Sequence, residues 1–406
     1  MNLSASAEDS MSATPLHGVR AVEVAHWMAG PAAGGVLQDW GAEVIKVEPH
    51  GGEPMRHIWG SMGADPDAPN GAFISANRAK KSIELDLRTD QGRETLHRLL
   101  AEADIFLTNL RPGALIRLGL SPQEVAERHP RLVYCSLTAY GWGGPDQDKA
   151  GYDLAAFFGR TGIAHEITTQ GTPPAALLQG LGDTFSAMTA VAGILAALVA
   201  RLQTGRGSFV EASLLRTGMW ALAGELGAQA LGGHPRPPRA RENCSTPMYN
   251  SYRTKDDRWF YLVGVQAARQ LPKVLGAIGR PELMADERFS SARAIAANRA
   301  EFIPLLDQAF ASKTLAEWDG IFTAFDVFWA PVQTPAEVVD DRQARAVGAW
   351  IHVDEVDADS VDAPIRFNGV RRTSVPRPPR SGEHTSEILG QLGPGPGRSA
   401  GGQESQ

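Results

Sequence analysis

Short runs rich in β-branched and apolar residues alternate with helix-like stretches from Gly18 onward, and this alternation constrains the fold more than any other feature of the sequence. The strand-like segments are 19–25, 42–48, 81–87, 104–109 and 132–141, and the helix-like segments are 30–41, 89–103 and 121–130. Repeated strand–helix–strand units predict a mostly parallel sheet with helices on both faces and ligands at the carboxyl ends of its strands. We therefore predict an α/β fold with a Rossmann-like large domain.

The pattern changes after residue 225, where the stretch 224–247 has the Gly, Pro and Arg content of a linker. A hairpin is predicted over 249–264, and helices are predicted over 271–279, 297–312 and 314–325. We expect a large domain formed by 15–225 and 325–390, and a smaller α+β domain formed by 226–324. Residues 1–14 and 391–406 lack apolar periodicity and are expected to be a disordered lead and tail.

The composition excludes several classes of function. With 406 residues, 43% of them hydrophobic, the chain can bury a sizeable core, and its net charge of −7 provides no electrostatic footprint for nucleic acid. The two cysteines, Cys135 and Cys244, are too few for a disulfide framework or a structural zinc site, and the ten histidines are scattered. We expect no metal and no nucleic-acid partner.

No signal peptide is visible at the N-terminus, and the apolar run 187–200 is shorter than the roughly 20 residues of a membrane-spanning helix. We interpret this run as a buried core helix. A cytoplasmic protein with no membrane partner is therefore expected.

A single acid, Asp183 in "LGDTFSAM", stands directly before this apolar run. One interpretation is that Asp183 caps the helix, because an N-cap carboxylate accepts hydrogen bonds from free backbone N–H groups. The other interpretation is a catalytic nucleophile, because a carboxylate held at a mostly buried helix start between small residues is suited to covalent chemistry. The local pattern leaves both open.

The first strand–helix unit partly resembles a nicotinamide-binding motif, because Glu48 follows the glycines by the distance expected for a ribose-binding acid. The glycines at 30, 34 and 35 do not have the G-x-G-x-x-G spacing, and Gly180 with Gly182 is a second incomplete match. A nicotinamide-dependent oxidoreductase is thus the weak alternative from another enzyme class.

Basic residues follow several predicted strands, at Lys80, Lys81, Arg88, Arg111 and Arg117. Most surface Lys and Arg are simply solvated. A parallel sheet would nevertheless bring Arg88 and Asn109 to the same carboxyl edge, where a phosphate-bearing ligand is easily clamped.

The chain resembles the class III CoA-transferases, the family of formyl-CoA transferase and of the carnitine and bile-acid enzymes. The resemblance lies in these stretches: "MAGPAAGGVLQDWGAEVIKVE", "SANRAKKSIELDL", "ADIFLTNLRPGALIRLG", "LVYCSLTAYG", "AGYDLAAF", "LGDTFSAM", "QTGRG", "YNSYRTKDDRWFYL" and "GEHTSEIL". They occur in order over nearly the whole chain.

The resemblance implies that Asp183 is the nucleophile and that the chain forms an interlocked homodimer. It implies that coenzyme A is part of the substrate, with no tightly bound cofactor, and that the partners are an acyl-CoA and a small carboxylic acid. The implied CoA-binding residues are Met28, Ala29, Leu85, Asp86, Leu87, Arg88, Asn109, Leu110, Arg111, Arg117, Ala150, Gly151, Tyr152 and Asp153.

The chain departs from the family pattern in two places. Pro49 replaces a basic residue often found after the second strand, with His50 and Arg56 as candidates to replace that contact. The glycine-rich loop that covers the aspartate in formyl-CoA transferase has no obvious counterpart.

Two further alternatives remain within CoA chemistry. The α-methylacyl-CoA racemases share the fold but carry a His-Asp pair where this chain has Tyr152 and Asp153, and a phenol, with an ordinary pKa near 10, is a poor base at neutral pH. His165 is the candidate to take over the role of that histidine. A non-catalytic CoA-binding protein is the more distant alternative.

Overall fold

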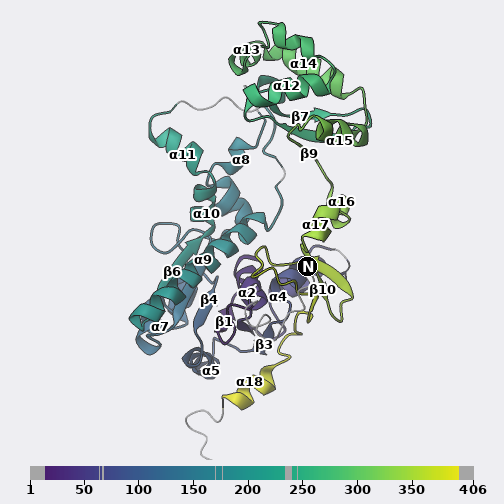
Figure 1. Cartoon of the computed structure of the whole chain (residues 1–406). Coiled ribbons are helices and arrows are strands. Elements are labelled where there is room, and N and C mark those ends of the chain that lie inside the picture. The colour runs from purple at the N-terminus through teal and green to yellow at the C-terminus, as the bar shows by residue number, and fades with distance from the viewer. Residues whose placement is uncertain are drawn as a thin grey trace, which may run out of the picture. The chain divides into compact units, whose positions relative to one another are not determined.

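The computed structural model describes residues 14–63, 65, 68–169, 171–175, 177–233, 240–244 and 246–392 (Figure 1). The expected lead and tail lie outside these residues, apart from residues 14, 391 and 392. The chain forms two compact units. The first unit comprises the described parts of Met1–Ala164, Ala176–Gly233 and Arg345–Gln406. The second unit comprises the described parts of His165–Ala175 and His234–Ala344.

The first unit contains a six-stranded parallel sheet in the order β3-β2-β1-β4-β5-β6. The strands are β1 (Arg20–Val24), β2 (Glu43–Glu48), β3 (Lys81–Glu84), β4 (Ile105–Thr108), β5 (Val133–Thr138) and β6 (Phe209–Ser213). The register places Val22 of β1 opposite Ile45 of β2 and Phe106 of β4. This order is that of the Rossmann fold, so the predicted fold class is confirmed.

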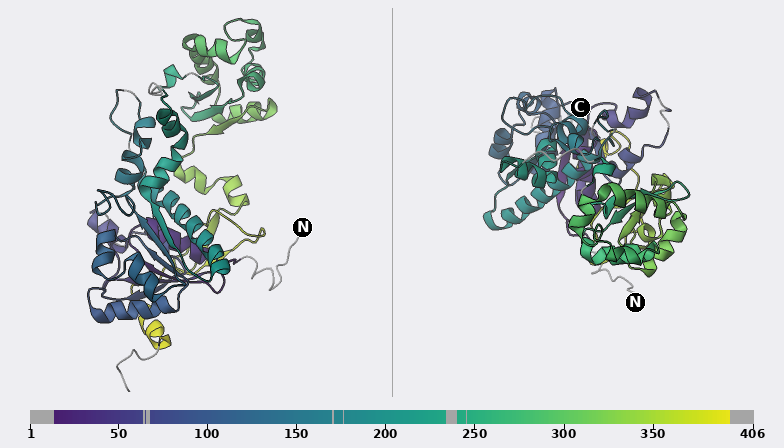
Figure 2. Two further views of the ribbon diagram at one scale, coloured as in Figure 1. Left: turned by 90° about the vertical axis from the view of Figure 1, so that its left-hand side faces the viewer. Right: turned by 90° about the horizontal axis from the view of Figure 1, so that it is seen from above.

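Helices cover both faces of this sheet, as Figure 2 shows. On one face, α2 (Ala29–Asp39) and α9 (Leu181–Thr204) pack against Val44, Ile105 and Val133. On the other face lie α5 (Asp90–Ala101), α6 (Pro112–Arg117), α7 (Pro122–Arg128) and α18 (Thr385–Gln391). Burial on both faces explains the nearly continuous apolar runs of β4 and β5, whereas β1, β2 and β3 also carry charged residues.

Helix α9 is longer and less buried than the predicted core helix. It begins at Leu181, and only one face, carrying residues such as Ala187, Val191 and Ile194, belongs to the core. The other face is open to solvent, with Val199 58% and Leu202 84% exposed. Among the described helices it alone is long and apolar enough to cross a membrane by length and composition, a test that the core helices of soluble proteins also pass. The expectation of a buried core helix therefore holds for one face of α9 only.

The rest of the first unit surrounds the sheet. A second sheet, in the order β11-β10-β12, was not expected from sequence and consists of β10 (Trp350–Val353), β11 (Ala358–Val361) and β12 (Ser374–Val375). The remaining helical segments are η1 (Pro54–His57), α3 (Ile58–Ser61), α4 (Gly71–Asn77), the π-helical η2 (Leu154–Gly159), α10 (Leu214–Ala221), α11 (Ala223–Ala230) and α17 (Arg342–Ala346), which ends in this unit.

The second unit is built on the predicted hairpin. Strands β7 (Tyr249–Arg253) and β8 (Trp259–Val263) pair antiparallel, and β9 (Trp329–Pro331) adds to β8. This pairing carries the unit beyond residue 324, the boundary expected from sequence. Its helical segments are α8 (Ile163–Glu166), η3 (Arg241–Asn243), α12 (Ala267–Ala277), η4 (Pro281–Ala285), α13 (Ala292–Ala297), α14 (Arg299–Phe310), α15 (Leu315–Ala324) and α16 (Pro335–Val339), of which α8 begins in the first unit.

Candidate active site

The start of α9 is formed by a glycine and not by Asp183. Gly180 is the N-cap residue, with a left-handed backbone (φ 83°) that favours glycine, and it provides no side-chain cap. Asp183 lies inside the first turn. No hydrogen bond to its carboxylate is present among the described residues. The capping interpretation of Asp183 is therefore wrong.

The capping role belongs to Asp153, which comes from another part of the chain. Its buried carboxylate accepts hydrogen bonds from the N–H of Gly180 at 2.8 Å and of Gly182 at 3.3 Å. It also accepts one from Leu154 N at 2.7 Å, at the start of η2. One carboxylate thus satisfies the free N–H groups of two helix starts.

A glycine is required at position 182. A β-carbon there would lie 2.6 Å from Cγ of Phe157 and 2.9 Å from Cβ of Asp153. No side chain fits at these distances, so Gly182 allows the helix start to approach Asp153 closely.

The environment of Asp183 disfavours its negative charge. The residue is half-buried, and burial together with the negative charge of Asp153 raises the pKa of Asp183 to about 7. A strongly perturbed carboxylate without a hydrogen-bond partner among the described residues is the combination expected of a reactive group.

The loop after β1 lies beside this helix start. Asn109 clamps its backbone, accepting a hydrogen bond from His26 N at 3.0 Å and donating one to His26 O at 2.6 Å. Glu53 accepts a hydrogen bond from Trp27 N at 2.6 Å. Met28 comes close to α9, because a β-carbon on Gly180 would lie 3.7 Å from Cγ of Met28.

Four fully buried charged residues support this loop, and we call them the buried charge cluster: Glu23, Lys46, Glu53 and Lys80. Lys46 Nζ lies 2.9 Å from Glu23 and 2.7 Å from Glu53, and Lys80 Nζ lies 2.7 Å from Glu23. Burial lowers the pKa of Lys80 to about 8. Lys80 is therefore an internal ion-pair partner, in contrast to the surface role that is usual for lysine.

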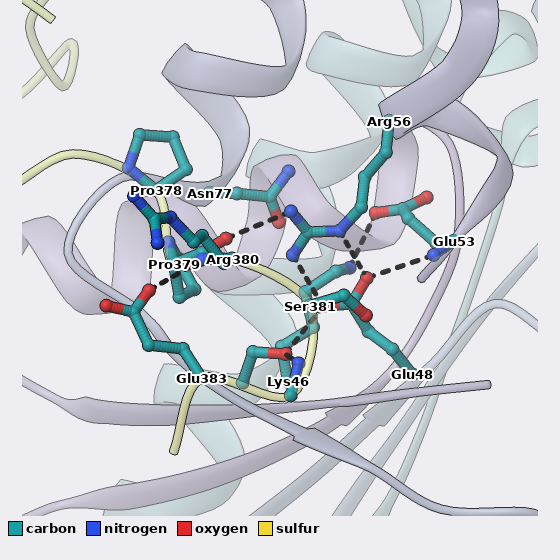
Figure 3. Close-up of polar contacts among 12 residues, drawn as sticks. Lys46, Glu48, Glu53, Arg56, Asn77, Pro378, Pro379, Arg380, Ser381 and Glu383 are labelled. Carbon is teal, nitrogen blue, oxygen red and sulfur yellow. Dashed lines mark hydrogen bonds and ion pairs between the residues drawn. The ribbon is translucent and has the colours of Figure 1, made fainter. Parts of the chain in front are cut away.

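The residues proposed as replacements for the basic residue at position 49 already have partners. Arg56 donates hydrogen bonds to both carboxylate oxygens of Glu48 and to the carbonyl of Pro379, an arrangement visible in Figure 3. His50 lies 3.1 Å from Glu84.

Glu48 is also committed to internal contacts. Burial would raise the pKa of Glu48, but hydrogen bonds from Arg56 and Ser82 and the charge of Lys46 bring it down to about 2. This contrasts with the exposed acid that a ribose-binding role would need.

The structure places the first part of the expected CoA-binding set after β3. Leu85 is buried, whereas Arg88 has an 87% exposed side chain that pairs with Asp86 at 2.8 Å. Arg88 and Asn109 do share the carboxyl edge of the sheet, as expected. Two strands lie between β3 and β4, so a ligand touching both must span about 14 Å.

The second part of the set follows β4 and β5. Arg111 donates a hydrogen bond to Asp148 O at 3.0 Å, and Arg117 is exposed at the end of α6 with no partner among the described residues. Ala150 is also exposed. Buried Ala29 belongs to the core on one face of the sheet, and half-buried Leu87 and Leu110 pack against the core on the other face.

Aromatic side chains meet next to Asp153. The ring of Tyr152, 60% exposed, lies edge-to-face with the ring of Trp27, at 5.8 Å between centroids and 88° between planes. Trp27 and Glu53 were not anticipated from sequence. His165 is exposed on α8, and no cluster of metal-ligating side chains occurs in the described part of the chain.

Comparison with known proteins agrees with the geometry. The model of the family described as CoA-transferase family III matches residues 16–385. The chain is 32% identical to (R)-2-hydroxy-4-methylpentanoate CoA-transferase of Clostridioides difficile, over 93% of this chain and 95% of the relative. It is 34% identical to cinnamoyl-CoA:phenyllactate CoA-transferase of Clostridium sporogenes, over 93% of each. A CaiB/BaiF family protein from Brucella suis superimposes with a TM-score of 0.81 at 32% identity, over 94% of this chain and all of that one.

Proposed function

Because the chain belongs to CoA-transferase family III, we propose that it moves coenzyme A from an acyl-CoA thioester to a free carboxylic acid through the carboxylate of Asp183. The observation that carries the proposal is the state of this side chain. Asp183 is half-buried, has a raised pKa, and is not used as a helix cap.

In the first step, an oxygen of Asp183 attacks the carbonyl carbon of the thioester. The C–S bond breaks, CoA leaves as a thiolate, and a mixed anhydride forms. The thiolate then attacks the side-chain carbonyl carbon of Asp183 and breaks its bond to the bridging oxygen. The donor acid leaves as a carboxylate, and an aspartyl-CoA thioester remains.

The acceptor acid repeats these steps in reverse. Its carboxylate attacks the aspartyl thioester, CoA leaves again as thiolate, and the thiolate attacks the acyl carbonyl of the new anhydride. The product acyl-CoA leaves, and Asp183 is again a carboxylate. No proton is gained or lost over the cycle, and no oxidant is needed.

The surroundings of Asp183 support these steps in two ways. Its raised pKa makes the ionised carboxylate a stronger nucleophile than an ordinary aspartate. The positive end of the α9 dipole favours the oxyanions that develop near the first turn. The N–H groups of Gly180 and Gly182 already donate hydrogen bonds to Asp153. These two hydrogen bonds orient the helix start.

We assign binding of the CoA moiety to the carboxyl edge of the sheet, with the exposed Arg88 and Arg117 as phosphate contacts. Met28, Gly151, Tyr152 and Asp153 lie nearer the reacting end. CoA enters as part of the substrate, with no tightly bound cofactor.

We also infer an interlocked homodimer. Support comes from large apolar side chains left exposed on α9 and α10, among them Leu202 and Trp220. A cytoplasmic location is inferred as well, because both cysteines are unpaired.

The test is to trap the covalent intermediate. The enzyme is incubated with acyl-CoA donors, including cinnamoyl-CoA, in the absence of acceptor, and intact-protein mass spectrometry follows the attachment of CoA. We expect one CoA per chain on the peptide containing Asp183, released by an acceptor such as phenyllactate. Turnover with several acyl-CoA and acid pairs but no adduct on Asp183 would contradict the mechanism.

A further inference from the structure

Three large side chains without formal charge are linked by contacts to the helix start that carries Asp183. Met28 approaches Gly180, and Tyr152 immediately precedes Asp153, whose carboxylate holds Gly180 and Gly182. Trp27 completes the group through its edge-to-face contact with Tyr152. We call Trp27 and Tyr152 the aromatic pair.

The backbone of Trp27 is held in an unfavourable conformation. Its φ of 67° lies in the left-handed region, which costs a bulky residue about 1–3 kcal/mol. Such a conformation persists only where surrounding contacts enforce it, and strain of this kind clusters at functional sites.

The enforcing contacts are on both sides of the residue. Glu53 accepts the hydrogen bond from Trp27 N, and Asn109 clamps His26. Glu53 is itself fixed by its ion pair with Lys46 inside the buried charge cluster, where Figure 3 shows both residues. The strain of Trp27 is therefore maintained by fully buried charges, and the result is a fixed ring against Tyr152.

The charges near Asp183 disfavour a second anionic group. The charged side chain that acts on Asp183 is Asp153, which is itself negative, and among the described residues no cation offsets it. A dicarboxylic acid would place its remote carboxylate near two acids and an aromatic surface, where it loses hydration without gaining a partner.

We propose that the aromatic pair forms the wall of the acyl site and that the enzyme prefers monocarboxylic acids with an apolar side chain over dicarboxylic acids. This inference rests on the proposed function, because it concerns the acid bound next to Asp183. An apolar acyl group packs against the rings of Trp27 and Tyr152, and this contact favours binding by the burial of apolar surface.

The test compares kcat/KM for 3-phenylpropanoate and for glutarate as acceptors with one acyl-CoA donor. The parent enzyme is expected to favour 3-phenylpropanoate. In Trp27→Ala this preference should fall about tenfold or more, as is usual when an apolar pocket loses a contact. Trp27→Phe should retain most of it, because a ring remains against Tyr152.

Trp259→Ala is the matched control, since it removes an exposed tryptophan that lies on β8 of the second unit. In this control the ratio of kcat/KM for the two acids should equal that of the parent enzyme. Glu53→Gln tests the contact that positions Trp27. The glutamine still accepts a hydrogen bond from Trp27 N, but its pairing with Lys46 is weaker. The ratio of kcat/KM for 3-phenylpropanoate to that for glutarate should therefore fall between the ratios of the parent and of Trp27→Ala.

The outcomes separate this inference from the proposed function. CoA transfer with a preference for glutarate, or equal losses for both acids in Trp27→Ala, would overturn the aromatic wall while leaving transferase activity in place. Absence of transfer to any acid, with no adduct on Asp183, would overturn the proposed function itself.

Discussion

The carboxylate of Asp153 accepts a hydrogen bond from the backbone N–H of Gly180 at 2.8 Å, although 27 residues separate the two in sequence. This contact divides two roles between two acids. Asp153 caps the start of α9, and Asp183, inside the first turn of the helix, keeps both carboxylate oxygens available. The cap also brings a negative charge close to Asp183, so the residue that orders the helix also tunes the nucleophile.

Replacing the proposed nucleophile should abolish transfer without unfolding the protein. In Asp183→Asn we expect kcat to fall by about a thousandfold or more, because the covalent route is lost. Asp183→Ala should behave alike, since Asp183 is not the cap and loss of a cap would cost about 1 kcal/mol in any case. Steady-state rates and circular dichroism check both statements, and near-normal turnover in either variant would remove Asp183 from the mechanism.

The raised pKa of Asp183 predicts opposite effects of pH on rate and stability. Only the ionised carboxylate attacks the thioester, so kcat/KM should fall about tenfold per pH unit below pH 7 and level off above it. A pH–rate profile measured with an acid that stays ionised throughout checks this. A profile flat between pH 5 and 8 would contradict it.

The stability effect follows because the folded-state pKa lies above the unfolded value of about 3.9. The unfolded chain loses the Asp183 proton first as pH rises, so this group destabilises the fold progressively from about pH 4 to pH 7. Asp183→Asn removes the effect and should be more stable than the parent by about 1–3 kcal/mol at pH 8. The gain should nearly vanish at pH 4, as measured by urea unfolding at the two pH values.

The close approach at position 182 can be tested with one methyl group. Gly182→Ala places a β-carbon against Phe157 and Asp153, so we expect a loss of about 1–3 kcal/mol and a large drop in activity as Asp153 is displaced. Gly224→Ala is the control, because that glycine lies in α11 with open space around it and alanine is the better helix former. Equal thermal stability of the two variants would argue against the packing role of Gly182.

Much of the large domain was predictable because its strands are buried on both faces. The run "LVYCSL", with one polar residue, forms β5, and "VRAVEVA", with its apolar residues around Arg20 and Glu23, forms β1. The edge strand β6 escaped prediction, because Phe209 is exposed, Glu211 interrupts the apolar run, and only its last two residues are buried. The short strands β10, β11 and β12 likewise lack a continuous apolar run.

The site was predictable only in part. Family resemblance pointed to Asp183, yet its neighbours depend on contacts between distant segments. The bond from Trp27 to Glu53 spans 26 residues and needs a left-handed backbone at a tryptophan, which no sequence rule indicates. The capping role of Asp153 was hidden for the same reason, since its partners follow by 27 and 29 residues.

The phosphate contact proposed for Arg88 predicts weaker CoA binding in Arg88→Ala, by about five- to tenfold, with unchanged stability, because the exposed side chain packs against little. The chain offers a closely matched control. Arg288 pairs with Asp286 at the same spacing, and both arginines donate from their backbone N–H and their guanidinium to that acid. Calorimetry should show unchanged CoA affinity in Arg288→Ala, and equal affinities for both variants would remove Arg88 from the site.

The last prediction separates CoA transfer from racemisation at the α-carbon. A racemase needs two groups that exchange a proton on opposite faces of that carbon, whereas the residue before Asp153 here is Tyr152, which is packed against Trp27. His165, the other candidate base, is exposed on α8.

The enzyme is therefore incubated with a 2-methylacyl-CoA in deuterium oxide, with and without a free acid. We expect CoA to pass to the acid with no deuterium at the α-position of either thioester. Mass spectrometry measures both the transfer of CoA and the deuterium content. Tyr152→His provides a matched variant, since it restores the His-Asp pair at the same position. Rapid α-deuteration by the parent enzyme without CoA exchange would assign it to proton transfer and would make Asp183 an acid–base group.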